Sequence, residues 1–125
     1  MNVVDSSAWL EYFADGPNAS FFSKAIEHID ELVVPSLTIY EVFKRVFQQR
    51  GEGDALRAIA VMQQGQVVDL DVPIALAAAR ISLEAGLPMA DSIVLATARA
   101  HGASLWTQDA DFRGMAGVQY RRRKG

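Results

Sequence analysis

Carboxylates are the side chains in this sequence that are best suited to do chemistry together. Asp5 follows an apolar run at the N-terminus, and Asp109 comes two residues after the run ASLWT. Glu41 and Asp91 each fall in the first turn of a predicted helix. In a parallel α/β sheet, the carboxyl ends of the strands and the starts of the following helices share one edge, outside which ligands bind. The sequence therefore predicts that these four acids meet in space.

Such a cluster predicts a site for a divalent metal ion. Two carboxylates about 4 Å apart repel by about 4 kcal/mol at an effective dielectric constant near 20, and a cation relieves this repulsion. Mg²⁺ and Mn²⁺ prefer oxygen ligands, whereas zinc sites usually contain histidine or cysteine. The chain has no cysteine, and His28 and His101 do not cluster. We expect Mg²⁺ as the cofactor, with Mn²⁺ as a possible substitute, and phosphodiester cleavage by metal-activated water as the chemistry.

Each acid also has a purely structural interpretation. Asp5 can cap the helix that follows it, and Thr38 with Glu41 forms the Thr-x-x-Glu pattern of a capping box. Asp91 can stabilise a helix dipole, and Asp109 can form an Asx-turn. Small hydroxyl residues beside the acids are expected to orient carboxylates or water around the metal. They are Ser6, Thr38 and Thr107.

The elements that must position these residues alternate along the chain. Short apolar runs predict strands at residues 1–4, 31–35, 66–70, 103–107 and 118–120. Apolar residues at helical spacing predict helices at residues 7–13, 20–29, 38–50, 54–64, 73–85 and 90–100. This alternation indicates an α/β/α sandwich with a mostly parallel central sheet.

Length and composition restrict the class of protein further. A chain of 125 residues, half of them hydrophobic and 22% charged, suits one domain over residues 1–125. No apolar run is long enough to span a membrane, and no signal peptide is recognisable. We expect a cytoplasmic protein. The net charge is −3, and the run from Arg121 to Lys124 contributes four positive charges, so the preceding residues carry −7. The body is therefore acidic, and residues 121–125 form a basic tail.

Several motifs, in order and at the expected spacing, resemble those of the PIN-domain ribonucleases and specifically the VapC-type toxins. They are VVDSSAWLEYF, VPSLTIYEVFKRV and GLPMADSIVLATARAHGASLWTQDADF. The resemblance implies a PIN-like fold and a Mg²⁺- or Mn²⁺-dependent endoribonuclease of a type II toxin–antitoxin pair. It also implies a homodimer that a VapB-type antitoxin inhibits, and an RNA substrate.

The resemblance carries the metal-binding and catalytic acids onto Asp5, Glu41, Asp91 and Asp109, and the hydroxyl before the last acid onto Thr107. The segment TQDADF offers two candidates for the fourth acid. We favour Asp109, because the family places this acid two residues after the threonine, and Asp111 stays as the alternative.

An acidic body would repel RNA, so basic residues near the acids are candidates for contacts with RNA phosphates. These candidates are Lys44, Arg45, Arg121, Arg122 and Arg123. A solvated helix face is the alternative for the first two, and a frayed terminus is the alternative for the tail.

Two other classes of protein compete with the ribonuclease. A phospho-acceptor receiver-like domain also combines an α/β sheet, carboxylates and Mg²⁺, but it would carry an acidic pair after the first strand and a lysine after the last. Asp5-Ser6-Ser7 lacks the pair, and no lysine follows ASLWT directly. A catalytically silent PIN-like binding module, whose acids serve only as caps, is the second alternative.

Overall fold

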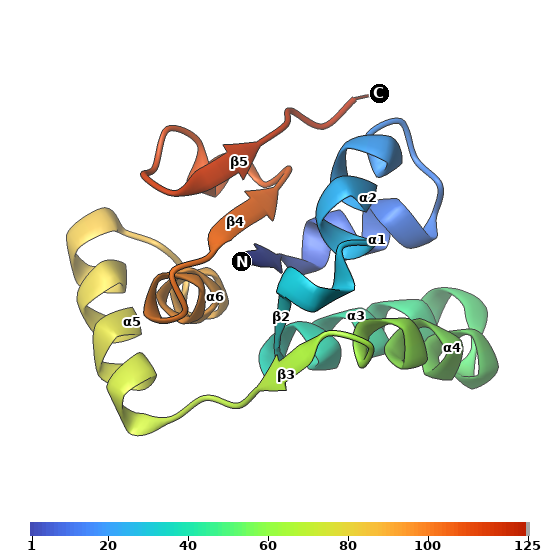
Figure 1. The fold of residues 1–125 in the computed structure, drawn as a ribbon, viewed down its shortest axis with the longest axis horizontal. Coiled ribbons are helices and arrows are strands. Elements are labelled where there is room, and N and C mark those ends of the chain that lie inside the picture. Colours follow the sequence, from blue (N-terminus) through green and yellow to red (C-terminus); the bar gives the residue numbers. More distant parts are fainter. Residues whose placement is uncertain (125) are drawn as a thin grey trace.

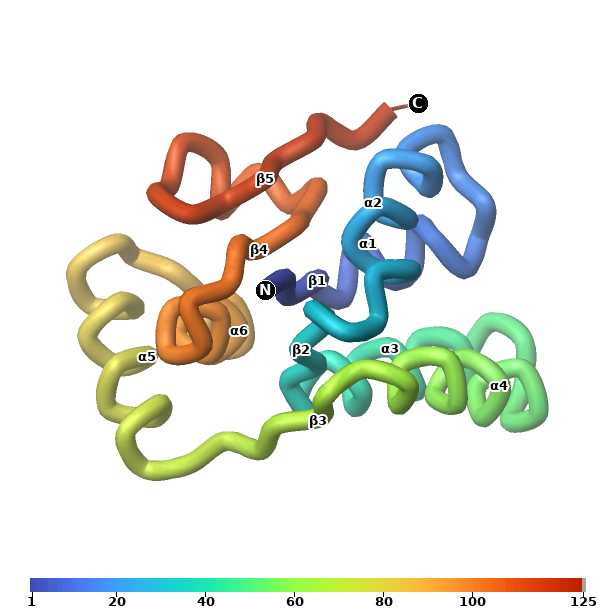
Figure 2. The backbone as a smooth tube through the Cα atoms, in the orientation of Figure 1, coloured from blue at the N-terminus to red at the C-terminus, as the bar shows by residue number. Residues whose placement is uncertain are grey.

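A five-stranded sheet organises the computed structural model, which describes residues 1–124 (Figure 1). The strands are β1 (Asn2–Val4), β2 (Leu32–Pro35), β3 (Gln66–Val68), β4 (Ser104–Thr107) and β5 (Val118–Tyr120). Their order is β3-β2-β1-β4-β5, and all neighbouring pairs are parallel. The chain places β1 in the middle, builds outward to β3, and then returns to the other side of β1 with β4 (Figure 2). The α/β fold predicted from the sequence is confirmed.

Helices connect the strands and cover both faces of the sheet. They are α1 (Ser6–Phe13), α2 (Ala19–Ile26), α3 (Ser36–Arg50), α4 (Glu52–Met62), α5 (Val72–Ala85) and α6 (Met89–Ala100), with short 3₁₀ turns η1 (Ile29–Glu31) and η2 (Ala110–Phe112). Helices α3 and α4 pack as one pair, and α5 and α6 pack as another on the opposite side of the molecule (Figure 1).

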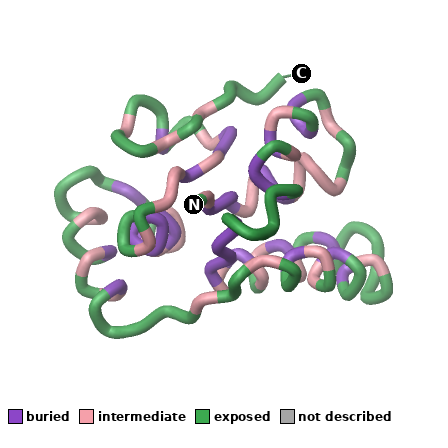
Figure 3. The backbone as a smooth tube through the Cα atoms, in the orientation of Figure 1, coloured by how far each residue is buried: buried purple, intermediate pink, exposed green. Residues whose placement is uncertain are grey.

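The core divides into layers because successive strand residues point to opposite faces of the sheet. Val4 and Val34 pack into the cluster with α1, α2, α3 and α4, whereas Val3 and Val33 pack into the cluster with α6. Both clusters are buried, and exposed residues concentrate on the outer helices and the C-terminal tail (Figure 3). The layered core fixes the sheet edge on which the acids stand.

Several predicted helix boundaries are wrong by two or three residues. Helix α2 ends at Ile26, and the following apolar Ile29 belongs to η1. Helix α3 begins at Ser36 with Pro35 as its N-cap, so Thr38 lies inside the helix and the predicted capping box does not form. The Thr38 hydroxyl instead donates to the Pro35 carbonyl at 2.6 Å. This bond satisfies a buried hydroxyl within its own turn.

Within residues 1–124, no single helix is long and apolar enough to cross a membrane, and α5 with α6 meets that test only as a pair bent by 119°.

Candidate active site

The Asp5 carboxylate lies at the end of the central strand, where it is 4% exposed. Its Oδ1 accepts hydrogen bonds from the Ser7 hydroxyl at 2.8 Å and from the Ala8 backbone N–H at 3.0 Å. Asp5 is thus the N-cap of α1, as the structural interpretation predicted. Its Oδ2 accepts one hydrogen bond, from the Thr107 hydroxyl at 2.7 Å. A carboxylate oxygen has two lone pairs, so Oδ2 keeps one available for a further ligand.

Thr107 joins the ends of the two strands at which the strand order reverses. While its hydroxyl donates to Asp5, the same oxygen accepts from the Asp109 backbone N–H at 2.9 Å. Because β1 and β4 are paired in register, with Val4 opposite Trp106, the residues that follow them lie side by side. Thr107 is fully buried, and its two bonds fix Asp5 relative to the turn that carries Asp109.

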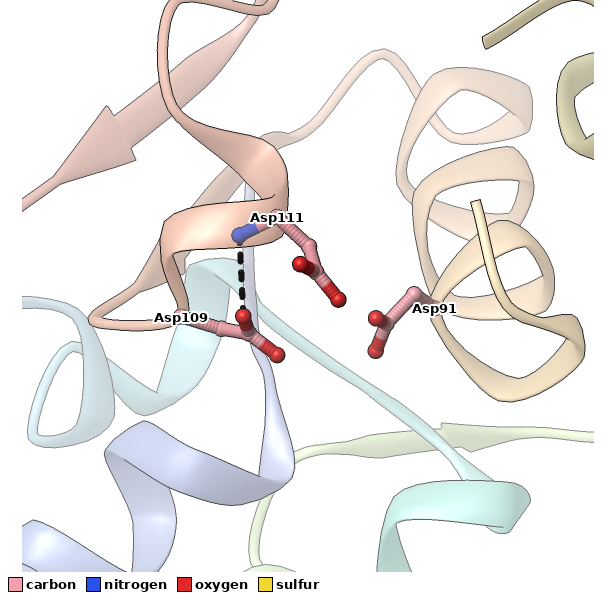
Figure 4. Close-up of side chains that lie close together, drawn as sticks. All are labelled: Asp91, Asp109 and Asp111. Carbon is pink, nitrogen blue, oxygen red and sulfur yellow. Dashed lines mark hydrogen bonds between the residues drawn. The ribbon is translucent and has the colours of Figure 1, made fainter. Parts of the chain in front are cut away.

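Asp91, Asp109 and Asp111 form the closest group of carboxylates. Each offers an oxygen within 4.8 Å of the others, and their side chains point toward one another from the start of α6 and from the turn around η2 (Figure 4). Asp109 Oδ1 accepts from the Asp111 backbone N–H at 2.9 Å, which is the predicted Asx-turn. This turn aims both acids at Asp91, so the two candidates for the fourth acid lie in one group.

Burial and neighbouring negative charges raise the pKa values of two of these acids. Burial raises the pKa of Asp5 to about 6, against hydrogen bonds from Thr107, Ser7 and Ala8 that lower it. Burial also raises the pKa of Asp91 to about 7, and the charges of Asp109, Asp5 and Asp111 and a hydrogen bond with Asp111 add to the rise. Asp5 therefore belongs to the same electrostatic unit as the group around Asp91. A divalent cation at this point would relieve the repulsion.

Glu41, like Asp5, lies outside the group of three acids whose oxygens are within 4.8 Å of one another. Burial raises the pKa of Glu41, and a hydrogen bond from the hydroxyl of Ser6, the residue after Asp5, opposes the rise. Glu41 lies in the second turn of α3, beside a small surface cavity that Lys44 and Arg45 also line. The described structure thus groups Asp91 and Asp109 with Asp111, couples Asp5 to them through its charge, and places Glu41 beside Ser6.

The predicted supporting hydroxyls have different partners. Thr107 contacts two of the acids, and Ser6 lies next to Glu41, as expected. Thr38 differs from the prediction, because its hydroxyl bonds a backbone carbonyl of its own turn. The Ser7 hydroxyl, in addition, donates directly to the Asp5 carboxylate.

Four of the predicted basic residues fall into two groups, those that lie over aromatic rings and those that line a large cavity. Lys44 lies over the Tyr40 ring, with 5.8 Å between the ammonium and the ring centroid, and the Arg121 guanidinium lies 4.2 Å from the Phe21 centroid. Arg45 and Arg123 line a large cavity beside the acids. The tail is bonded to the rest of the fold as far as Arg122: the Arg121 N–H donates to the Thr107 carbonyl at 3.0 Å, and the Arg122 carbonyl accepts from the Asn18 side chain.

Sequence reasoning missed the buried pair Asn18 and Gln108. Asn18 Nδ2 donates to Gln108 Oε1 at 3.1 Å and to the Arg122 carbonyl at 3.0 Å. Asn18 occupies the N-cap position of α2, but its side chain makes no capping bond. Its amide instead ties the C-terminal segment to β4, and nothing in the local sequence signals such a long-range contact.

The residues at the sheet edge fit a hard divalent cation. The donor set consists of carboxylate oxygens from Asp91, Asp109 and Asp111, with the remaining Asp5 lone pair nearby. Oxygen donors of this kind suit Mg²⁺ and Mn²⁺, whereas the lack of nearby histidine and of cysteine disfavours zinc.

Comparison with known proteins places the chain in a family. The model of the PIN domain matches residues 3–118, and the chain belongs to the PIN-domain family. No curated protein sequence matches the chain.

Solved structures share its fold. A toxin–antitoxin complex from Klebsiella pneumoniae has 23% identity and a TM-score of 0.81, and the match covers 95% of this chain and 96% of that one. VapC20 from Mycobacterium tuberculosis, a sarcin–ricin loop cleaving toxin, has 14% identity and a TM-score of 0.77, with 93% and 95% covered. DNA-bound VapBC from Salmonella typhimurium has 13% identity and a TM-score of 0.75, with 97% and 96% covered.

Proposed function

We propose that the chain is a Mg²⁺- or Mn²⁺-dependent endoribonuclease that acts as the toxin of a VapBC-type toxin–antitoxin pair. The observation that carries the proposal is the convergence of Asp91, Asp109 and Asp111 beside the buried Asp5. Membership of the PIN-domain family supports nuclease chemistry, and the toxin–antitoxin neighbours support a VapB-type partner. A cytoplasmic location and action as a homodimer are parts of the same proposal.

In this mechanism the acids hold the metal and Thr107 keeps them in place. Carboxylate oxygens of Asp91, Asp109 and Asp111 would bind the ion, and Asp5 Oδ2 would offer it a further lone pair. The bound ion would polarise the phosphodiester and activate the attacking water. Thr107 sets the direction of the Asp5 carboxylate and of the turn that begins at Asp109. Glu41, beside Ser6, would bind the same ion or orient water at it.

A cleavage assay tests the proposed function. The chain, purified free of any antitoxin, is incubated with RNA in Mg²⁺ or Mn²⁺, and in EDTA. We expect cleavage with either metal, none in EDTA, and a loss of at least about 100-fold for Asp5→Asn, the order of effect that removing one electrostatic group from a catalytic site produces. Asp69→Asn, the same change at an exposed acid, is the control. Cleavage in EDTA, or full activity of Asp5→Asn, would refute the mechanism, and no cleavage under any condition would favour the silent binding module.

A further inference from the structure

A cavity of about 680 Å³ opens directly beside the acidic site, between α1, α3, α4 and the C-terminal segment. Ser6, Ser7 and Gln108 form the wall that it shares with the site. Ser7 bonds Asp5, and Gln108 directly follows Thr107 in the chain. The cavity is thus lined by chain neighbours of Asp5 and Thr107 rather than by the acids themselves, and a strand held in it would lie next to the site.

The residues that line this cavity carry a net positive charge. Of its two acids, Asp54 pairs with Arg57, and Glu11 accepts a hydrogen bond from the Asn18 backbone N–H at 2.7 Å and keeps its charge. The cavity is also lined by Arg45, Arg50 and Arg123. Within residues 1–124, the structure records no salt bridge to these three arginines. Four arginines and two acids line the cavity, so about two net positive charges face it in an otherwise acidic protein.

The position of Arg123 is built into the fold. The preceding residue, Arg122, has its carbonyl held by the Asn18 side chain, and Asn18 is held in turn by Gln108. Asn18 is 1% exposed and Gln108 is 3% exposed, so this clamp is inside the protein. The clamp places the residue after it, Arg123, at the cavity wall, where its side chain stays exposed.

We propose that this cavity holds the single-stranded RNA next to the position of cleavage, and that Arg45, Arg50 and Arg123 bind its phosphates as positioning residues. The inference rests on the proposed ribonuclease function. A guanidinium binds phosphate oxygens through paired N–H donors, and three of them supply the positive charge that the acidic site lacks. The half-buried side chains of Leu10 and Phe13 give the same cavity an apolar floor, and bases pack on such surfaces without sequence preference.

RNA suits the cavity better than a protein segment does, because its charge complements the wall. Every linkage of an RNA strand carries one negative charge, whereas an apolar helix in the cavity would cover three arginines without a partner for them. An antitoxin segment is therefore the competing occupant, and the experiment distinguishes the two.

The test compares two matched pairs of substitutions. Arg45→Gln/Arg123→Gln removes two charges from the cavity, and Arg80→Gln/Arg99→Gln removes two exposed charges on α5 and α6, outside it. Binding of fluorescein-labelled single-stranded RNA is measured by anisotropy in EDTA over a series of KCl concentrations. For single-stranded RNA, each phosphate contact that is removed reduces the magnitude of the slope of log K against log salt by about 0.7. Arg45→Gln/Arg123→Gln should therefore reduce it by about 1.4. The control pair should leave the slope unchanged.

Cleavage kinetics provide a second measurement that a merely structural effect would not reproduce. The cavity pair should raise KM about tenfold with little change in kcat, and unfolding curves should match those of the parent. If the double substitution changes neither the salt slope nor KM, the inference is wrong. Cleavage of RNA by the parent protein would still support the proposed function in that case. Loss of affinity for the antitoxin alone would also overturn the inference, because the cavity would then be a protein site. If the parent binds RNA through these arginines but cleaves nothing, the proposed function fails instead.

Discussion

Replacing Asp5 by asparagine should stabilise the metal-free protein while abolishing its activity. Asp5 is buried, and its pKa rises from 3.8 to about 6. One pKa unit corresponds to 1.36 kcal/mol. Ionisation of Asp5 is therefore about 3 kcal/mol less favourable in the folded chain than in the unfolded chain, which lowers the free energy of unfolding by that amount. Asparagine has the same shape, accepts the bonds from Ser7 and Ala8 through its carbonyl oxygen, and carries no charge. The variant therefore avoids that cost.

The pH dependence of this effect has a definite sign. Well below pH 3.8, Asp5 is protonated in both the folded and the unfolded chain, so its ionisation adds nothing to the difference in stability between the parent and Asp5→Asn. Between pH 3.8 and about 6 the unfolded chain releases the proton before the folded one, and the parent loses stability as pH rises. Above about pH 6 the difference is constant. Asp5→Asn should then exceed the parent by up to about 3 kcal/mol, before the loss of a charged hydrogen bond with Thr107 is subtracted.

The assay is urea unfolding in EDTA at several pH values from 4 to 8, followed by circular dichroism. Asp69→Asn serves as the control for net charge, since this acid is exposed. Millimolar Mg²⁺ should reverse the order of stability, because an ion that binds only the folded parent stabilises it. A variant that is less stable than the parent at pH 8 in EDTA, or a difference that does not change with pH, would refute the electrostatic reasoning.

Three further predictions concern the frame of the site and the surface. Thr107→Val keeps the shape of the side chain but removes the donor to Asp5 and the acceptor for the Asp109 N–H, so it should cost about 1–3 kcal/mol in urea unfolding and lower cleavage more than it lowers substrate binding. Gly65→Ala should lower the melting temperature, because its Cβ would lie 2.9 Å from the Leu32 carbonyl oxygen. Gly53→Ala, in the first turn of α4, should raise stability by roughly 0.5–1 kcal/mol, because a Cβ there meets only the Arg57 side chain at 3.8 Å. Equal effects of the two substitutions would contradict the packing argument. Leu76→Lys/Leu83→Lys should convert the proposed homodimer to a monomer in light scattering, because these side chains on α5 are 60% and 87% exposed, and an unchanged mass would exclude this face as the interface.

Periodicity and turn chemistry sufficed to predict the order of the elements. The strand ending at Val4 and the strand ending at Thr107 are apolar runs, and Gly86 ends α5 in the left-handed conformation that favours glycine, with φ of 69°. Placing Asp5 and Asp109 at strand ends then followed from the α/β pattern. The start of α3 could not be predicted in this way, because proline fits the N-cap position of α3 without a side-chain bond, and Thr38 offered a more familiar signal.

The fine structure of the site depends on contacts that are distant in sequence. Thr107 meets Asp5 across 102 residues, and Asn18 meets Arg122 across 104. The local sequence around Asn18 indicates only a turn and the start of a helix. It does not predict that the Asn18 side chain binds the C-terminal segment. Likewise, the choice between Asp109 and Asp111 required the turn at η2, which brings both carboxylates toward Asp91.

Direct titration with Mn²⁺ tests the central claim, that Asp91, Asp109 and Asp111 hold a divalent metal. Isothermal titration at pH 8 should show saturable Mn²⁺ binding to the parent, with affinity that falls as pH drops through about 7, where protons compete for Asp91. Asp91→Asn should lose this binding, and Asp69→Asn should keep it. Undiminished Mn²⁺ binding by Asp91→Asn, or no binding by the parent, would contradict the account.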